Sequence, residues 1–238
     1  MKILSIECSA GPASAAIIED RKVIGSSFVN VKLTHSQTLM PMIESLLKSC
    51  ATDISEISGI AVSAGPGSFT GVRIGISAAK GIAAPDDLPC VAVSALDSMA
   101  EVFRGHHCVL CAVMDARCGQ FYNSIYKIEG NRIHKFVPDR AIMHGELIEE
   151  IKDIDAEKII VCGDGAELFM NFAKDIDNIE IANPTLRFQN AIGTALCAYD
   201  KFISNDTISC NNLLPIYLRL PQSERELKAK MLLINKEN

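Results

Sequence analysis

The residue types best suited to bind a ligand lie in residues 63–75, with the sequence SAGPGSFTGVRIG. An apolar run enters a Gly-Pro-Gly turn that opens directly into a predicted helix, an arrangement that presents backbone N–H groups to an anion. Gly65, Gly67 and Ser68 are therefore candidate anion contacts. Neither nucleotide motif is matched: the lysine of a P-loop is absent, and the third glycine of Gly-x-Gly-x-x-Gly stands one residue late, at Gly71.

The predicted helix after this turn carries small residues at every fourth position. Gly71, Gly75 and Ala79 share one face, with Ala78 and Ile82 beside them. Because each helical glycine costs ~1 kcal/mol relative to alanine, something must approach this face closely. Three interpretations stay open: tight packing on the chain's own sheet, docking of a partner helix, or a bound ligand.

Metal and hydrolase chemistry are not predicted. Cys108 and Cys111 lie three apart in an apolar strand, so their thiols point to opposite faces and cannot share a metal. No Gly-x-Ser-x-Gly elbow is present. The histidines include no pair four apart, the spacing that places two ligands on one helix face; they are His35, His106, His107, His134 and His144.

Hydrophobic periodicity predicts two lobes that each begin with strands and continue with alternating helices and strands, as in a duplicated α/β unit. We place the lobes at residues 1–103, with the partner-binding helices, and 104–238, with the tail. In the first lobe we expect strands at 3–6, 13–18, 22–30, 56–62 and 90–93, and helices at 34–50, 68–84 and 94–103. In the second we expect strands at 108–114, 121–128, 132–136 and 158–162, and helices at 144–151, 166–175, 189–202 and 224–233.

Several of these segments resemble the TsaB (YeaZ) family of bacterial tRNA-modification proteins. The resemblance is carried by residues 3–9 (ILSIECS), 65–75 (GPGSFTGVRIG), 114–122 (MDARCGQFY) and 215–219 (PIYLR), together with the helix that starts at His35. It implies an α/β fold of two lobes, each a mixed sheet with flanking helices, shared by actin, hexokinase and the Hsp70 ATPase domain (the ASKHA fold).

Enzymes of that superfamily bind ATP between the lobes, and the related TsaD family also holds a metal through two histidines four apart. Here the position four after His35 is Leu39, so no metal site is implied. The first phosphate turn would correspond to Glu7 and Ser9, the second to Arg117 and its neighbours. Gly163 and Gly165 would form an adenine-side turn. We expect no required cofactor, with ATP or ADP as an optional ligand.

The resemblance implies a non-catalytic scaffold that dimerises with a TsaD-type catalytic subunit, joined by a TsaE-type ATPase. This assembly would make threonylcarbamoyladenosine beside the anticodon of tRNAs decoding ANN codons. Alone, the chain would form a homodimer. The expected interface residues are Leu39, Met42, Ile43, Leu46, Gly71, Val72, Gly75, Ala78, Ala79 and Ile82, and a Gly75→Leu substitution is expected to block assembly without disturbing the fold. Tyr217 and Arg219 would fix the tail on the first lobe or serve the second partner's site.

Two other functions stay open: a small-molecule kinase or ATPase of the same fold with its own inter-lobe nucleotide site, and a free-standing homodimeric regulator.

A formal charge of −6 argues against strong autonomous binding to nucleic acid, so tRNA contact is expected to be indirect. The 9 cysteines follow no disulfide framework and predict a reducing compartment. Without an apolar run long enough to span a membrane, we expect a cytoplasmic protein.

Overall fold

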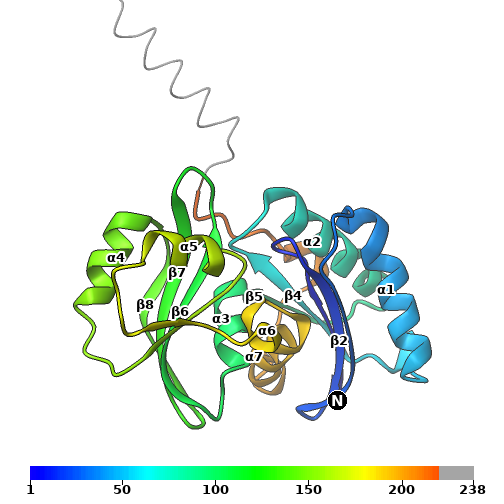
Figure 1. The fold of residues 1–238 in the computed structure, drawn as a ribbon. Helices are drawn as coiled ribbons and strands as arrows, with labels where there is room; N and C mark the ends of the chain where they lie inside the picture. Colours follow the sequence, from blue (N-terminus) through cyan, green and yellow to red (C-terminus); the bar gives the residue numbers. More distant parts are fainter. Residues whose placement is uncertain (220–238) are drawn as a thin grey trace, which may run out of the picture.

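The computed structural model describes residues 1–219 and forms two lobes, each built on a five-stranded mixed sheet (Figure 1). The strand order is β3-β2-β1-β4-β5 in the first sheet and β10-β9-β6-β7-β8 in the second. In both, two antiparallel pairings are followed by parallel ones: β1 pairs with β4 in parallel, and β6 with β9. This shared plan confirms the predicted fold class. The expected helix at 224–233 lies outside the described residues.

The first lobe contains each of the five strands and three helices predicted for it. Its elements are β1 (Lys2–Glu7), β2 (Ala13–Glu19), β3 (Lys22–Val29), α1 (His35–Ser49), the 3-10 turn η1 (Ile54–Glu56), β4 (Gly59–Gly65), α2 (Phe69–Ala83), η2 (Ala84–Asp86), β5 (Cys90–Ser94) and α3 (Ala95–Glu101). Thr34 occupies the N-cap position of α1, but its side chain makes no cap hydrogen bond. The helix begins at His35 and includes Pro41 in its second turn.

The second lobe has more strand than the sequence predicted. Its elements are β6 (His107–Asp115), β7 (Gln120–Glu129), β8 (Arg132–Met143), α4 (His144–Lys152), β9 (Ile159–Cys162), α5 (Ala166–Phe172), β10 (Ile179–Ile181) and α6 (Pro184–Arg187). β8 extends seven residues beyond the predicted end because it follows β7 through two register irregularities. Cys111 and Cys108 pack in different clusters, as expected for opposite faces of one strand.

The last described helix, α7 (Ala191–Ile203), returns to the first lobe. Ala195, Ala198 and Phe202 pack on the face of the first sheet that carries Ile3 and Ala61. The chain then runs along β5, where Ile208 and Cys90 exchange two backbone hydrogen bonds of 2.8 and 2.9 Å. The expected boundary at 103/104 separates the two sheets, but α7 and the segment after it belong with the first lobe.

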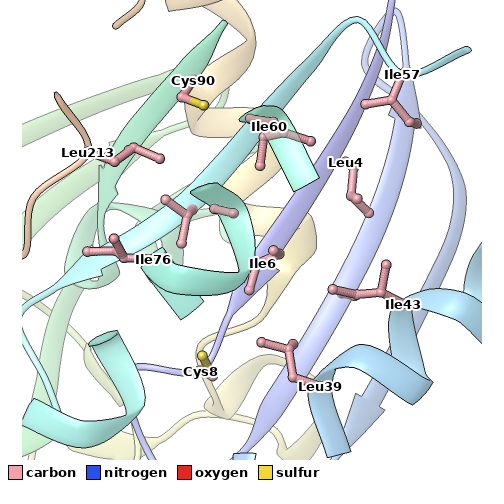
Figure 2. Close-up of a cluster of buried hydrophobic side chains, with 14 of the residues drawn as sticks. Leu4, Ile6, Cys8, Leu39, Ile43, Ile57, Ile60, Ile76, Cys90 and Leu213 are labelled. Atoms are coloured by element: carbon pink, nitrogen blue, oxygen red, sulfur yellow. The ribbon is translucent and has the colours of Figure 1, made fainter. Parts of the chain in front are cut away.

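The other face of the first sheet is covered by α1 and α2. Figure 2 shows Leu39 and Ile43 of α1 directed toward the strand that carries Leu4 and Ile6, within one buried cluster. Because strand residues alternate between faces, β1 supplies Leu4 and Ile6 to this layer and Ile3 to the α7 layer. Within residues 1–219, no helix combines the length and apolar character that crossing a bilayer requires.

Candidate functional site

A cleft of about 410 Å³ separates the two lobes and collects half of the predicted anion contacts. Ser9, Gly67, Ser68 and Arg117 line it, whereas Glu7, Gly65, Gly163 and Gly165 do not. The remaining lining residues are Ala10, Gly11, Phe69, Thr70, Met114, Asp115, Ala116, Tyr122, Asp164, Tyr217 and Arg219. The topology places the ends of β1, β4 and β6 here, as expected for ligand sites at the carboxyl ends of strands.

The glycine-rich turn packs against the end of β1 and uses its amides inside the chain. The Ser68 N–H donates to the Ser9 carbonyl at 2.6 Å, and the Gly71 N–H donates to Ser68 Oγ at 3.3 Å. A Cβ at Gly67 would lie 2.1 Å from the Ser9 carbonyl oxygen, and one at Gly71 would lie 2.2 Å from that of Cys8. These glycines thus permit close approach of two backbones, and two amides of the predicted anion cradle already have partners.

Glu7 lies beneath this turn, fully buried. Its Oε1 accepts a hydrogen bond from the Ser9 N–H at 2.6 Å, while Oε2 has no hydrogen-bond partner among the described residues. Burial raises the pKa of Glu7 above its ordinary value, although the neighbouring Ser9 and Ser63 groups oppose the shift. A carboxyl group held in this way favours its neutral form and lies behind the cleft wall.

A second acidic residue, Asp164, lines the cleft from the second lobe. Burial raises its pKa to about 6, even though it accepts a hydrogen bond from Gln189 Nε2 at 3.1 Å. The nearby Asp115 carboxylate contributes to the shift and itself pairs with Arg117 at 3.0 Å. The predicted anion contact Arg117 is therefore engaged within the chain.

The remaining predicted glycines are explained by backbone packing. A Cβ at Gly163 would lie 2.0 Å from the Val113 carbonyl oxygen, and one at Gly165 would lie 2.9 Å from the Asp115 nitrogen. Gly65 has a φ of +112°, and its Cβ would lie 2.6 Å from the Ile216 carbonyl oxygen. Close contact between segments of this chain accounts for all three glycines, and none of them lines the cleft, so their expected contact with a nucleotide stays a prediction.

These features fit a nucleotide phosphate poorly. Phosphate groups would face the Asp115 and Asp164 carboxyl groups, and the Ser68 and Gly71 amides that could have offset this are already paired. Among the described residues, no group of three or more histidine, cysteine or acidic side chains is arranged to hold a metal ion. The two arginines that line the cleft, Arg117 and Arg219, are engaged with groups of the chain itself: Arg117 pairs with Asp115, and Arg219 donates to the Ala116 carbonyl.

The residues expected at a partner interface are mostly core residues. Figure 2 shows Leu39 within the buried cluster of the first sheet. Eight of the expected residues are buried, which corrects that expectation: Leu39, Met42, Ile43, Leu46, Gly71, Val72, Gly75 and Ala79. The small-residue face of α2 meets the chain's own β1, because a Cβ at Gly75 would lie 2.8 Å from Cys8 Sγ. Gly75→Leu would therefore disturb the fold, and only Ala78 and Ile82 keep part of their surface accessible.

The same two helices nevertheless present an accessible surface, to which Leu39 and Ala78 of the expected set contribute. A groove of about 610 Å³ lies between α1 and α2, lined by His35, Ser36, Leu39, Met40, Phe69, Thr70, Arg73, Ile74, Ser77 and Ala78. Met40 is 48% exposed, and the neighbouring loop adds Val31 and Leu33 at 51% and 59%. We call the residues lining this 610 Å³ space the α1–α2 groove. Large exposed apolar side chains gathered in this way are typical of an interaction surface.

Sequence reasoning missed Phe69 and Arg73. The Arg73 guanidinium lies over the Phe69 ring, 3.7 Å from its centroid, where a cation–π interaction is favourable. Their four-residue spacing on a helix was a signal that could have identified the pair. Tyr217, from the far end of the described chain, stacks on the same ring.

Sequence comparison relates this chain to proteins of tRNA threonylcarbamoyladenosine synthesis. The family model described as TsaD, tRNA N6-adenosine threonylcarbamoyltransferase, matches residues 29–210. The tRNA threonylcarbamoyladenosine biosynthesis protein TsaB of Bacillus subtilis is 31% identical over 94% of this chain and 96% of its own length. The TsaB of Escherichia coli is 29% identical over 97% of this chain and 100% of its own length.

Solved structures show the same fold. YeaZ from Pseudomonas aeruginosa superposes with a TM-score of 0.74 at 20% identity, covering 91% of this chain and 99% of that protein. The (R)-2-hydroxyglutaryl-CoA dehydratase component A of Acidaminococcus fermentans shares the fold more distantly, with a TM-score of 0.52 at 10% identity over 84% of this chain and 98% of its own. The full-length match to TsaB relatives, on a YeaZ-like fold, shows that this chain belongs to the TsaB (YeaZ) family.

Proposed function

We propose that this chain is a non-catalytic subunit in the synthesis of threonylcarbamoyladenosine in tRNA. The relatives that match it over nearly their whole length are named for that biosynthesis. The observation that carries the proposal is the accessible apolar α1–α2 groove, which offers a protein partner a surface while the inter-lobe cleft lacks a phosphate cradle.

The proposed partner is a TsaD-type catalytic subunit. Because a TsaD family model matches residues 29–210, a TsaD-type protein would carry helices equivalent to α1 and α2. Two such helix pairs can meet in a nearly two-fold arrangement, and two copies of this chain could form an isologous homodimer in the same way when the partner is absent. A TsaE-type ATPase completes the proposed assembly, and a TsaC-type enzyme would supply threonylcarbamoyl-adenylate.

The proposed substrate is the adenosine beside the anticodon of tRNAs decoding ANN codons, with the other subunits making most of the tRNA contacts. The formal charge of −6 supports this division, because tRNA binding depends on neutralising phosphates. The proposal assigns the chain to the cytoplasm and requires no cofactor in it. ATP or ADP would be an optional ligand.

The first test is to mix the chain with its cognate TsaD-type subunit and measure molar mass by size exclusion with light scattering. A one-to-one heterodimer that replaces any homodimer supports the proposal. Failure to associate, with or without nucleotide, contradicts it, and ATP binding by the chain alone would then favour the kinase or ATPase alternative.

A matched pair of variants locates the surface. Ser77 is exposed and lines the α1–α2 groove, whereas Ser45 is equally placed on the surface of α1 but does not line it. Ser77→Arg is expected to weaken partner affinity about tenfold or more, since it brings a bulky charge into an apolar contact. Ser45→Arg should leave affinity within about twofold, which corresponds to less than 1 kcal/mol. Equal affinities for the two variants would contradict the α1–α2 groove as the docking surface.

A further inference from the structure

Residues 213–219, which we call the C-terminal latch, connect the two lobes at the cleft. Leu213 is fully buried in the core between the first sheet and α2 (Figure 2). From there the chain turns toward the cleft, where Tyr217 and Arg219 line the wall. Figure 1 shows this last coloured segment leaving the first lobe and reaching the second.

The latch is anchored to the first lobe at two points. The Ile216 N–H donates to the Ala64 carbonyl at 2.7 Å, in the space that only a glycine at position 65 leaves open. The Tyr217 ring stacks on Phe69 with centroids 5.0 Å apart, and its hydroxyl accepts a hydrogen bond from Arg73 Nε at 2.8 Å. Arg73 is thereby held between the hydroxyl of Tyr217 and the ring of Phe69.

Arg219 anchors the latch to the second lobe. The Arg219 guanidinium donates to the carbonyl of Ala116 and, at 3.4 Å, to that of Arg117, in the loop that follows β6. A guanidinium has several donors in fixed geometry, which suits it to hold two successive carbonyls. One residue, Leu218, separates this anchor from Tyr217, so movement of the second lobe against the first would be transmitted to the Phe69 stack.

Phe69 connects the C-terminal latch to the α1–α2 groove, because it contacts Tyr217 and lines both the inter-lobe cleft and the groove. We propose that the C-terminal latch positions Phe69 and Arg73 for partner docking, with Tyr217 and Arg219 as positioning residues. Loss of the Arg219 anchor frees the latch from the second lobe, loosens the Tyr217 stack and leaves Arg73 without a fixed direction in the groove.

Hydrogen–deuterium exchange on the full chain tests this directly. Arg219→Ala is expected to speed exchange not only in residues 115–120, at the lost anchor, but also in residues 69–73, which Arg219 does not touch. A loss of about 1.4 kcal/mol in local stability would raise exchange about tenfold. Arg219→Lys, which keeps the charge and one donor, should restore part of the protection. Leu214→Ala, at a side chain 66% exposed, is the matched control and should change neither segment. Unchanged exchange in residues 69–73 of Arg219→Ala overturns the proposal.

A second measurement uses partner affinity and rests on the proposed function. Arg219→Ala and Tyr217→Ala are both expected to weaken binding of the TsaD-type subunit about five- to tenfold, and Tyr217→Phe, which keeps the stack, by less. If the unmodified chain binds and Arg219→Ala binds equally well, the latch has no positioning role. If the unmodified chain does not bind, the proposed function fails, and the exchange experiment still decides whether the latch orders α2.

Discussion

At the scale of single residues, two carboxyl groups are held out of water at the inter-lobe cleft: Asp164 lines the cleft, and Glu7 is buried behind its wall. Both carboxyl groups have raised pKa values, chiefly because burial disfavours the charged form. Neither is compensated by a basic side chain among the described hydrogen bonds and ion pairs. Burying these two carboxyl groups therefore lowers the free energy of unfolding of the chain at neutral pH.

Asp164→Asn is expected to change the pH dependence of stability. The pKa of Asp164 rises from 3.8 to about 6 in the folded chain, so its favourable contribution is present below about pH 4 and is lost as pH rises through 6. The full shift corresponds to about 3 kcal/mol, and access to solvent from the cleft lowers this to about 1–2 kcal/mol. Urea unfolding at pH 4.5 and 7.5 measures this. The free energy of unfolding of the variant, relative to that of the unmodified chain, should be higher at pH 7.5 than at pH 4.5. A difference that does not change with pH would contradict the assigned pKa.

Gly75→Ala is expected to act on the core. Its new methyl group would lie 2.8 Å from Cys8 Sγ, so the variant should lose about 1–3 kcal/mol in free energy of unfolding. Cys8→Ala removes the obstructing sulfur, and the double variant should be more stable than the sum of the two single effects predicts. Denaturant titration of the four proteins measures this coupling. Strict additivity would mean that the two side chains do not meet.

At the scale of elements, the repeating small residues of α2 could be identified from sequence, but not the direction they face. Four-residue spacing predicts a close approach, and Gly71 and Gly75 indeed pack against Cys8. The same pattern would serve a partner helix equally well. The turn before α2 packs on Ser9 through Gly67, a contact between segments distant in sequence that helical spacing does not encode.

Most strands and helices were predictable because their patterns are local, whereas α7 was assigned to the wrong lobe. Its periodicity predicts a helix, yet nothing local indicates that Ala195 and Ala198 pack with Ile3, almost 200 positions earlier. Gly193 permits a further close approach of α7, to α3, because a Cβ at this position would lie 2.1 Å from the Ser98 carbonyl oxygen. The choice between the two roles expected for Tyr217 and Arg219 stayed open for the same reason, since their contacts are with residues distant in sequence.

The junction between α3 and β8 should depend on one lysine. Lys135 Nζ lies 2.7 Å from Asp97 and 2.6 Å from Asp139, and Asp139 accepts a hydrogen bond from Ser94, the N-cap of α3. Lys135→Met would leave both carboxylates without their cation and is expected to cost about 1–3 kcal/mol, less than for a fully buried pair. Thermal unfolding of Lys135→Met and of Lys127→Met, whose ion pair is exposed, compares the two sites. Equal losses would contradict a special role for Lys135.

For the whole molecule, net charge makes the clearest prediction. With a formal charge of −6, the chain alone should not retain tRNA in a gel-shift experiment at about 0.15 M salt, where contacts to phosphates are already weakened. The complex with a TsaD-type subunit should retain it. Tight tRNA binding by the isolated chain would contradict the indirect role proposed for it.

The return of α7 to the first lobe has a consequence for synthesis of the protein. On the ribosome, the strands of the first sheet emerge by residue 94, but the helix that covers one of its faces is not complete until residue 203. The apolar side chains of Ile3, Ala61 and Val91, which α7 covers in the folded chain, therefore stay exposed to solvent while the second lobe is translated. A chain that stops before α7 would carry a finished second sheet beside an open first one, the kind of surface that molecular chaperones bind and that aggregates when they do not.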